Sequence, residues 1–433
     1  RDFCLSRGLG DVYKRQLLAW AVSICPLCVQ MLIDPTKVSP TSLHTPCPRL
    51  WVFNPGHEEA LRIPPHLRYT PTSEVRQMRY DLAPLLNLLA EQGDYIYRPA
   101  LTPSESAVLL DHEGHVTSVE HLRGESLEVK PWGLEPHILR ELQEAPLLQG
   151  IDLRLPPITP TYLQMAHRHA AHGLLSRLVE QGGYPAELLP RWVEARATKA
   201  ETQHALQHAL DDRALRDLGS REEVLIKRPF SSSGRGVHPF PRLYTERHLE
   251  ALTGSCQRLG MISIEPLWQV REDWALEYER TAEGRVVFVA FSLFETQATG
   301  RAYAGNLLLP QMALRERLTE HIGERALAEL IQLHSEYLTE ALEGSDYVGY
   351  MGIDLFLYEQ SGVLKLHPCV EINLRTTMGV LAHLAYEHYL APRGSGRFLV
   401  EYVPRSSVPM TEGDQLLTPW DEDALFRAVL RPS

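Results

Sequence analysis

The sequence lacks the features that mark several large classes of protein. Its net charge of −12 leaves no basic excess of the kind that nucleic-acid-binding proteins carry, although a local basic pocket for phosphates stays possible. No segment of repeat length recurs, and glycine and proline are near average use, which excludes fibrous and low-complexity chains. A hydrophobic share of 44% is ordinary for a globular protein with a buried core and excludes wholesale disorder.

Cysteine is also scarce. Four of the six cysteines lie close to the N-terminus, and the other two cannot make a disulfide framework: Cys4, Cys25, Cys28, Cys47, Cys256 and Cys369. Cys25 and Cys28 have the spacing of a zinc or redox pair, but no second pair accompanies them, so chance spacing is the favoured interpretation. This cysteine use favours a reducing cytoplasm.

Only residues 17–33 approach a long hydrophobic run, and they are shorter than the ~20 apolar residues that a membrane-spanning helix needs. Lys14 and Arg15 precede the run, so a signal peptide or a short anchor is the alternative. Those two residues lie in DVYKRQ, which resembles the translation of a sequencing adapter. We therefore expect residues 1–49 to be a non-native or disordered segment, with Met31 a candidate start, and the remainder to be soluble, cytoplasmic and without membrane contact.

From residue 50 onward the chain shows alternating strand and helix signals. Leu50–Phe53 is an apolar run that ends at the turn signal Asn54-Pro55-Gly56. Residues 81–93 have helical apolar spacing and a glycine stop, and residues 95–97 favour a strand. The later segments are predicted as helices over 162–181, 199–218 and 314–342, and as strands over 224–227, 285–293, 350–358 and 363–373. This alternation predicts an α/β (α+β) fold.

The first segment with chemical content is VLIKRPFSSSGRGV, residues 224–237. A predicted strand delivers Lys227, and three serines and two glycines follow. Small residues let backbone N–H groups approach an anion closely, and Lys227 and Arg235 supply positive charge. A flexible hairpin loop is the alternative, and no GKS or GKT follows to make a Walker motif.

The second such segment brings together Asp354, Glu371 and Asn373. Glu371 and Asn373 are two apart in a predicted strand, so their side chains share a face, and oxygen ligands of this kind suit Mg²⁺. A simple hairpin with the preceding strand offsets Asp354 from Glu371 by roughly three residues, or ~10 Å. A bulge near His367-Pro368 would close that gap. A polar pair at an exposed strand end is the alternative.

In their order along the chain, these parts resemble the ATP-grasp superfamily over roughly residues 160–400. The resemblance implies an ATP-grasp fold of two α+β lobes preceded by a small Rossmann-like domain. The implied divisions are an N-terminal α/β domain (50–155), a lobe with the phosphate loop (156–265), a lobe with the metal site (266–405) and a C-terminal tail (406–433). In the first of these, residues 54–59 and 131–133 follow strands, where α/β domains place ligands, although a turn-only role is slightly favoured.

The resemblance also implies which residues bind the nucleotide. Two lysines, Lys199 and Lys227, correspond to those that hold the ATP phosphates. The mobile loop that closes on the phosphates corresponds to Ser231, Ser232, Ser233, Gly234, Arg235 and Gly236. Glu265 and Leu267 fall where the hinge reads adenine. Asp273 falls near the ribose-binding acid, with an exposed loop carboxylate as the alternative.

For catalysis the resemblance implies Asp354, Glu371 and Asn373 as ligands of Mg²⁺, with Mn²⁺ as an alternative metal, and Arg375 as the arginine that stabilises the transferring phosphate or acyl-phosphate. Lys227 and Arg375 are thus the predicted catalytic residues. The implied activity is an ATP-dependent ligase that joins a small-molecule carboxylate to an amine or thiol, with no nucleic-acid partner. The alternatives are an ATP-grasp small-molecule kinase and a catalytically inactive nucleotide-sensing protein.

Overall fold

The computed structural model describes residues 47–433, apart from residues 103, 213–214, 216–217, 231–235, 298–301, 404–409 and 420–423. Residues 1–46 lie outside the described residues. Nearly all of the N-terminal segment expected over residues 1–49 is therefore not described. Within the described ranges, no helix is long and apolar enough to cross a membrane.

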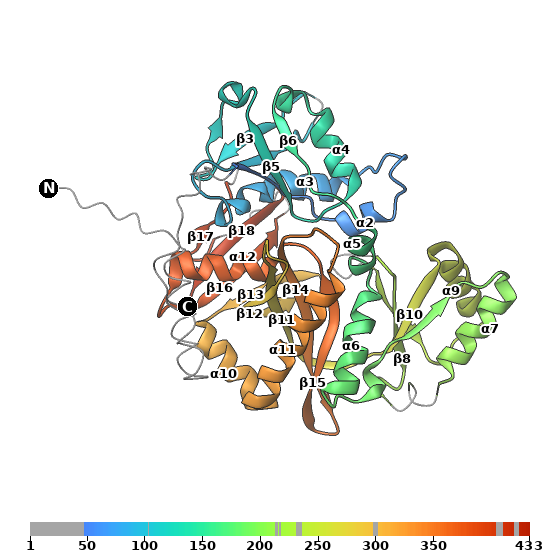
Figure 1. Ribbon diagram of the computed structural model, residues 1–433. Coiled ribbons are helices and arrows are strands. Elements are labelled where there is room, and N and C mark those ends of the chain that lie inside the picture. Colours follow the sequence, from blue (N-terminus) through green and yellow to red (C-terminus); the bar gives the residue numbers. More distant parts are fainter. Residues whose placement is uncertain are drawn as a thin grey trace, which may run out of the picture. The chain divides into compact units, whose positions relative to one another are not determined.

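An N-terminal unit is built on a six-stranded sheet in the order β4-β3-β2-β1-β5-β6 (Figure 1). Its strands are β1 (Arg49–Val52), β2 (Tyr95–Arg98), β3 (Val108–Asp111), β4 (Val116–Thr117), β5 (Ser126–Pro131) and β6 (Asp152–Arg154). Strand β1 pairs in parallel with β2 and β5. Leu50 and Val52 pack into one core while Trp51 and Phe53 pack into another, as expected for parallel strands covered on both faces.

The position predicted for a helix over residues 81–93 is wrong. The regular helix α3 (Ser73–Leu82) comes earlier, where Thr72 Oγ1 accepts a hydrogen bond from Val75 N at 3.3 Å and caps it. A 3₁₀ helix, η2 (Ala83–Leu88), follows with Pro84 in its first turn, and proline has no N–H to continue the α-helical bonds. The other helices of this unit are α2 (His57–Leu61), η3 (Glu120–Leu122), α4 (Pro136–Glu144) and η4 (Pro146–Leu148).

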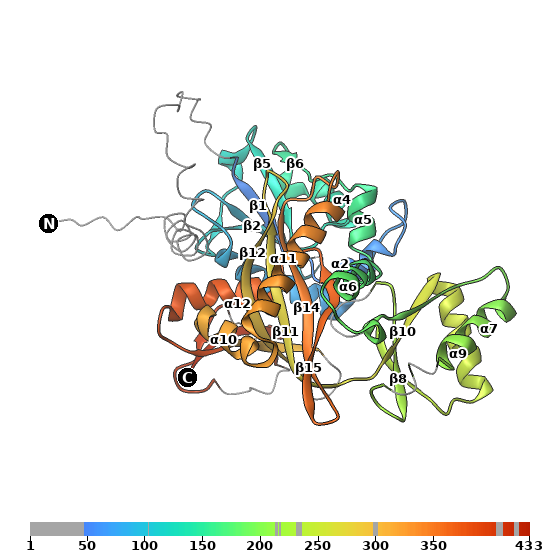
Figure 2. The same cartoon turned by 60° about the horizontal axis from the view of Figure 1, so that its bottom comes forward.

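A smaller antiparallel sheet follows, in the order β7-β10-β8-β9. Its strands are β7 (Arg191–Glu194), β8 (Glu223–Lys227), β9 (Val237–Pro241) and β10 (Met261–Pro266), and the helices packed on it are α7 (Lys199–Leu210) and α9 (Glu246–Leu259). Figure 2 shows these two helices together beside β8 and β10. The helix expected over residues 199–218 thus ends at Leu210, and the helix expected over 162–181 is divided into α5 (Pro160–Met165) and α6 (Ala170–Gln181), which η5 (Ala186–Leu188) follows.

The largest sheet has eight strands in the order β15-β14-β11-β12-β13-β16-β18-β17. They are β11 (Gln269–Arg280), β12 (Val286–Thr296), β13 (Tyr303–Leu308), β14 (Gly349–Gln360), β15 (Val363–Asn373), β16 (Gly396–Tyr402), β17 (Gln415–Leu416) and β18 (Phe426–Pro432). Three helices accompany this sheet: α10 (Gln311–Ile322), α11 (Glu324–Ala341) and α12 (Met378–Ala385). A π-helical turn, η6 (Tyr386–Leu390), follows α12. Trp274, Leu276 and Tyr278 of β11 pack into the core with α10 and α11, so the residues that alternate with them face the other way.

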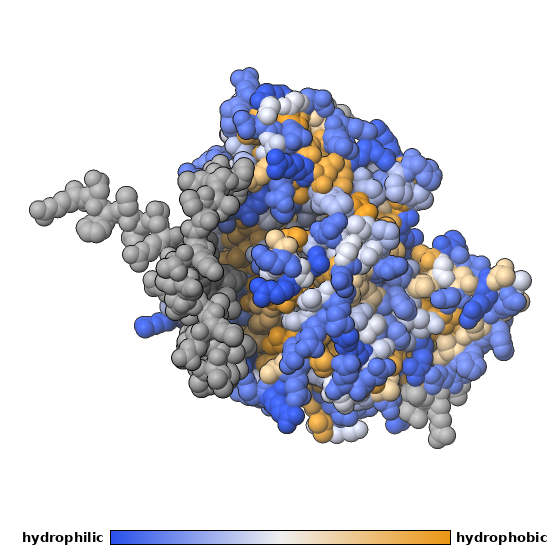
Figure 3. Space-filling view, in the orientation of Figure 1, coloured by the Kyte–Doolittle hydropathy of each residue, from blue (hydrophilic) through white to orange (hydrophobic). Residues whose placement is uncertain are grey.

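The mixed α/β class is confirmed by these three sheets and their helices. A small antiparallel sheet carries Lys227, and a larger antiparallel sheet that follows it carries Asp354 and Glu371, in agreement with the two α+β lobes expected from the sequence. Figure 3 shows hydrophilic residues over most of one face of the molecule, with smaller apolar groups between them.

Candidate active site

A cavity of about 820 Å³ is bordered by loops of the N-terminal unit, by the small sheet and by one face of the large sheet. Its lining includes Lys227 and Glu265 from the small sheet and Asp354 and Glu371 from the large one. Residues that the sequence places more than a hundred positions apart therefore share one cavity. Its volume lies in the range typical of small-molecule sites.

Asp354 of β14 lies directly opposite Glu371 of β15. The pairing shifts between Asp354 and Phe356, where residues 368–370 of β15 face Leu355 alone. The bulge expected near His367-Pro368 is therefore confirmed, and it brings the two carboxylates to the same face and the same level of the sheet.

The electrostatics of this pair follow from burial and like charge. Burial raises the pKa of Asp354 to about 7, and the charge of Glu371 adds to the rise, whereas Arg375 and a hydrogen bond with Asn373 oppose it. Asn373 lies opposite Gly352, two positions along from the carboxylate pair. The site thus holds two facing carboxylates and a nearby amide.

Arg168, which the sequence did not single out, contacts this pair. Its Nη2 donates to Glu371 Oε1 at 2.7 Å and its Nε donates to the same oxygen at 3.2 Å. Its backbone N–H donates to the carbonyl of Pro229, in the loop after β8, at 3.0 Å. Arg168 lies between α5 and α6 in a stretch notable only for its histidines, so no local pattern could have identified it.

The donor set fits a hard divalent cation. Among the described residues no group of three or more His, Cys, Asp or Glu side chains could hold a metal, but Asp354, Glu371 and Asn373 offer two carboxylates and an amide oxygen. Mg²⁺ takes such oxygen ligands and usually keeps several waters. Burial first, and the charge of Glu371 second, raise the pKa of Asp354, and a cation bound beside it would favour its ionised form.

Lys227, the last residue of β8, is paired with Glu265. Its Nζ lies 2.6 Å from Glu265 Oε2, and its side chain is only 7% exposed. Ser263 Oγ donates to Glu265 Oε1 at 2.9 Å. Burial alone would raise the pKa of Glu265, but the pairing with Lys227 and the bond from Ser263 hold it below its ordinary value. Lys227 therefore carries its charge into the cavity already oriented.

The segment between the small and large sheets borders the same cavity through Pro266, Leu267 and Trp268. The carbonyl of Leu267 accepts a hydrogen bond from Ser220 N at 2.8 Å, which fixes this connection. Asp273 of β11 also lines the cavity, on the face that Asp354 shares. The predicted adenine and ribose residues therefore border the cavity beside Lys227.

Of the predicted nucleotide site, two described residues do not line the cavity, and five further residues are not described. Lys199 is exposed at the start of α7 and does not line the cavity. Ser231, Ser232, Ser233, Gly234 and Arg235 lie outside the described residues. Gly236, the last residue of the predicted loop, is buried, and its carbonyl accepts a hydrogen bond from Arg228 N at 2.9 Å. The end of the loop is thus anchored next to Lys227.

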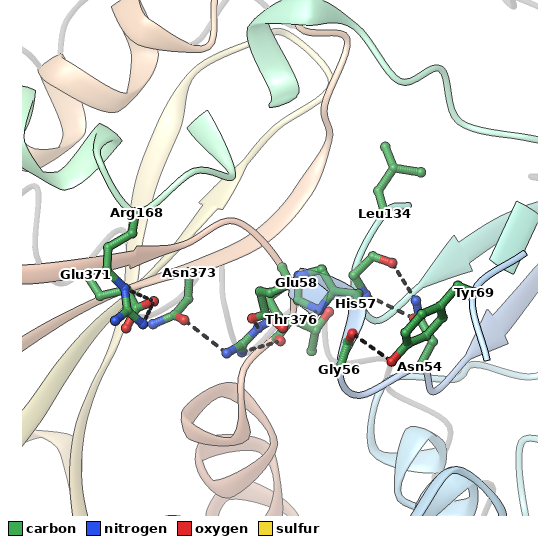
Figure 4. A network of polar contacts seen from close by, with 12 residues as sticks. Asn54, Gly56, His57, Glu58, Tyr69, Leu134, Arg168, Glu371, Asn373 and Thr376 are labelled. Atoms are coloured by element: carbon green, nitrogen blue, oxygen red, sulfur yellow. Dashed lines mark hydrogen bonds and ion pairs between the residues drawn. The ribbon is translucent and has the colours of Figure 1, made fainter. Parts of the chain in front are cut away.

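Arg375 is held by two acceptors from different parts of the chain, Glu58 and Asn373, both of which are labelled in Figure 4. Its Nε donates to Glu58 Oε1 at 3.0 Å, and its Nη2 donates to Asn373 Oδ1 at 2.9 Å. His57 Nδ1 lies 3.0 Å from the other oxygen of Glu58. Burial alone would raise the pKa of Glu58, but nearby His57 and Arg375 lower it to about 2. Glu58 is therefore a permanent anion at neutral pH.

The turn that leads into α2, the helix that carries Glu58, is tied to a second loop of the N-terminal unit. Asn54 Nδ2 donates to the carbonyl of Gly133 at 2.7 Å, and Gly133 N donates back to Asn54 Oδ1 at 3.1 Å. Trp132, next to Gly133, borders the cavity, as do Gly56 and Glu58. The sequence slightly favoured a turn-only role for both loops, but in the structure both contribute to the cavity wall.

No family model matches the sequence, and no curated protein matches it. Solved structures that are similar include a Campylobacter jejuni biotin carboxylase bound to βγ-ATP, at 12% identity, 71% of each chain covered and a TM-score of 0.42. The N5-carboxyaminoimidazole ribonucleotide synthetase of Thermus thermophilus is 17% identical, with 70% of this chain and 76% of that chain covered and a TM-score of 0.39. The N5-carboxyaminoimidazole synthase of Aspergillus clavatus, solved with ADP and 5-aminoimidazole ribonucleotide, is 11% identical, with 89% and 94% covered and a TM-score of 0.41. At these identities and scores the likeness concerns the path of the chain and not the reaction.

Proposed function

We propose that the protein is an ATP- and Mg²⁺-dependent ligase that activates a small-molecule carboxylate as an acyl-phosphate and joins it to an amine. The observation that carries the proposal is the placement of Asp354 directly opposite Glu371, in one cavity with Lys227 and Arg375. Two facing carboxylates suit a metal that bridges phosphates, and the two cations suit the phosphates themselves.

In this proposal the nucleotide occupies the side of the cavity formed by Lys227 and by residues 265–268. Lys227, held by Glu265, contacts the ATP phosphates, and the connection between the sheets contacts the base. Asp354, Glu371 and Asn373 hold Mg²⁺, which when bound neutralises charge on the phosphates. The carboxylate substrate lies against Arg375.

The reaction needs positioning and charge stabilisation rather than a protein nucleophile. A substrate carboxylate oxygen attacks the γ-phosphorus of ATP, the bond to the β,γ-bridging oxygen breaks, and ADP leaves. The amine nitrogen then attacks the acyl carbon, phosphate departs, and one N–H proton leaves with it. Arg375 stabilises the negative charge of the transferring phosphoryl group, and its bonds to Glu58 and Asn373 keep the guanidinium in place.

A trapping experiment tests the proposed function. Purified protein is incubated with MgATP, hydroxylamine and a panel of amino acids, N-acetylated amino acids and dipeptides. A ligase is expected to release ADP and form a hydroxamate with at least one carboxylate, because hydroxylamine intercepts an acyl-phosphate. Glu371→Gln is expected to abolish both products. Release of ADP with a stable phosphorylated product and no hydroxamate would favour a kinase, and MgATP binding without turnover on the whole panel would favour a sensor.

A further inference from the structure

A second buried carboxylate, that of Glu277, lies in the wall of the same cavity but has no part in the phosphate and metal site proposed above. Glu277 lies within β11 and is 1% exposed. Its cross-strand neighbour in β14 is Gly352, whereas Asp354 lies opposite Ala275, two positions along β11. Glu277 and Asp354 are therefore diagonal neighbours on one face, roughly 7–8 Å apart.

The described residues give this carboxylate one hydrogen bond and no ion pair. Thr377 Oγ1 donates to Glu277 Oε2 at 2.7 Å. The same hydroxyl accepts a hydrogen bond from Val380 N at 3.1 Å and so caps helix α12. The start of α12 therefore orients Glu277 with a neutral group, not with a lysine or arginine.

Two glycines leave room for the carboxylate. A Cβ atom on Gly379 would lie 2.0 Å from Glu277 Oε1 and 2.6 Å from Ser292 Oγ. A Cβ atom on Gly352 would lie 2.7 Å from Glu277 Oε2. Any larger residue at either position would collide with the carboxylate in its present place, so the surroundings accommodate Glu277 without neutralising it.

A buried carboxylate without a cation is costly. Burial raises the pKa of Glu277 to about 8, and the charge of Asp354 adds to that rise, against the opposing effects of the hydrogen bond from Thr377 and of Arg375. A ligand that brings a positive charge to this wall would restore the ionised form and make a desolvated ion pair.

The adjoining lining shows what kind of cation fits. Trp132 and Met378 border the cavity beside Thr377, and the carbonyl of Trp132 accepts a hydrogen bond from Thr376 N at 3.2 Å. Phe53 packs edge-on against Trp132, with ring centroids 5.0 Å apart, and lines the cavity as well. An ammonium group on an apolar body matches a carboxylate flanked by aromatic and thioether side chains, whereas a metal ion would need more oxygen ligands.

We propose that Glu277 binds the protonated amino group of the acceptor, and that the acceptor is a primary amine with an apolar body. The proposal rests on the proposed function, because it names the acceptor class of that same site. The diagonal spacing from Asp354 places the bound ammonium next to a carboxylate activated at the metal site. The ammonium gives one proton to the Glu277 carboxylate, and its nitrogen then has the lone pair with which it attacks the acyl carbon.

The test compares three proteins: wild type, Glu277→Gln, and the control Glu279→Gln. Glu279 lies two residues further along the same strand face but outside the cavity lining. Each protein, saturated with MgADP, is titrated calorimetrically with leucinamide, methioninamide and phenylalaninamide, which carry an ammonium group and no carboxylate. The neutral probe is 4-methylpentanamide, which is leucinamide without its amino group. Affinity for MgADP and the melting temperature show that each variant is folded.

We expect wild type and Glu279→Gln to bind leucinamide more tightly than the neutral probe. Glu277→Gln is expected to weaken leucinamide binding roughly tenfold or more and to lose the preference. Leucinamide binding by Glu277→Gln within twofold of wild type, or no binding of any of the three amides by wild type, overturns the inference. Failure of the proposed function shows separately, as absence of hydroxamate from wild-type protein, because the titration requires no turnover.

Discussion

Arg375 Nε donates a hydrogen bond to Glu58 Oε1 at 3.0 Å, so a side chain from helix α2, after the first strand, holds the arginine that follows the metal-site strand. The pair joins residues 317 positions apart in the sequence. It also shows why the N-terminal unit matters to the chemistry, since the arginine proposed to stabilise the phosphoryl group has one of its main acceptors there.

Replacing Glu58 with Gln is expected to lower both catalysis and stability. The loss of a charged hydrogen-bond partner for Arg375 should cost roughly 1–3 kcal/mol of unfolding free energy at pH 7. Because the folded-state pKa of Glu58 lies near 2, below its ordinary 4.5, this stabilisation is fully present above about pH 5 and disappears as the pH falls from 4.5 towards 2. Urea unfolding of both proteins from pH 2 to 7 measures it.

The control is Glu250→Gln, which changes an exposed glutamate of helix α9. Its stability should follow the wild type across the whole pH range. A difference between wild type and Glu58→Gln that stays constant down to pH 2 would show that the ion pair with Arg375 does not hold the pKa of Glu58 low.

Replacing Lys227 with Met is expected to weaken ATP binding. A charged hydrogen bond to a phosphate contributes roughly 1.5–3 kcal/mol, which corresponds to a roughly tenfold to hundredfold rise in Kd. Fluorescence titration with a labelled ATP analogue measures it. Lys365→Met is the matched control, because Lys365 is exposed on β15 and bonded to Gln360. Equal affinities of wild type and Lys227→Met would remove Lys227 from the nucleotide site.

Replacing Asp354 with Asn is expected to abolish stabilisation by Mg²⁺ in the presence of ADP. The amide keeps the shape of the side chain but lacks the charge that attracts the metal. Thermal unfolding with and without Mg²⁺ measures the difference. Glu359→Gln, on the same strand but paired with Arg271, should keep the full Mg²⁺ effect, and an unchanged effect in Asp354→Asn would contradict the assignment.

Replacing Arg168 with Gln is expected to destabilise the metal-free protein more than the metal-bound one. Without Arg168, Glu371 loses its ion-pair partner and faces Asp354 uncompensated. The melting temperature in EDTA should therefore fall, and saturating MgADP should recover part of the loss. A drop of equal size under both conditions would indicate that Arg168 acts on the fold alone.

Much of the fold was predictable because it is encoded locally. The strands over 95–97, 224–227, 350–358 and 363–373 all lie within observed strands, since short β-branched and apolar runs bounded by turn residues favour strands without help from the remainder of the chain. The helix expected over residues 81–93 was wrong, because apolar spacing alone does not reveal that Pro84 interrupts it.

The candidate site also has some features that are encoded locally and others that depend on tertiary packing. Glu371 and Asn373 share a face because side chains in a strand alternate, and Lys227 ends a strand that its own apolar residues specify; both facts are local and could be predicted from the amino-acid order. The register that sets Asp354 opposite Glu371 depends on a bulge whose presence the sequence could only suggest. Arg168 and Glu277 had no local signal, and Glu58 had only its place in a segment that follows the first strand. Their roles come from contacts between segments that only the packing of the three sheets brings together, because a carboxylate or guanidinium acquires its partner and its pKa from neighbours in space rather than from neighbours in the chain.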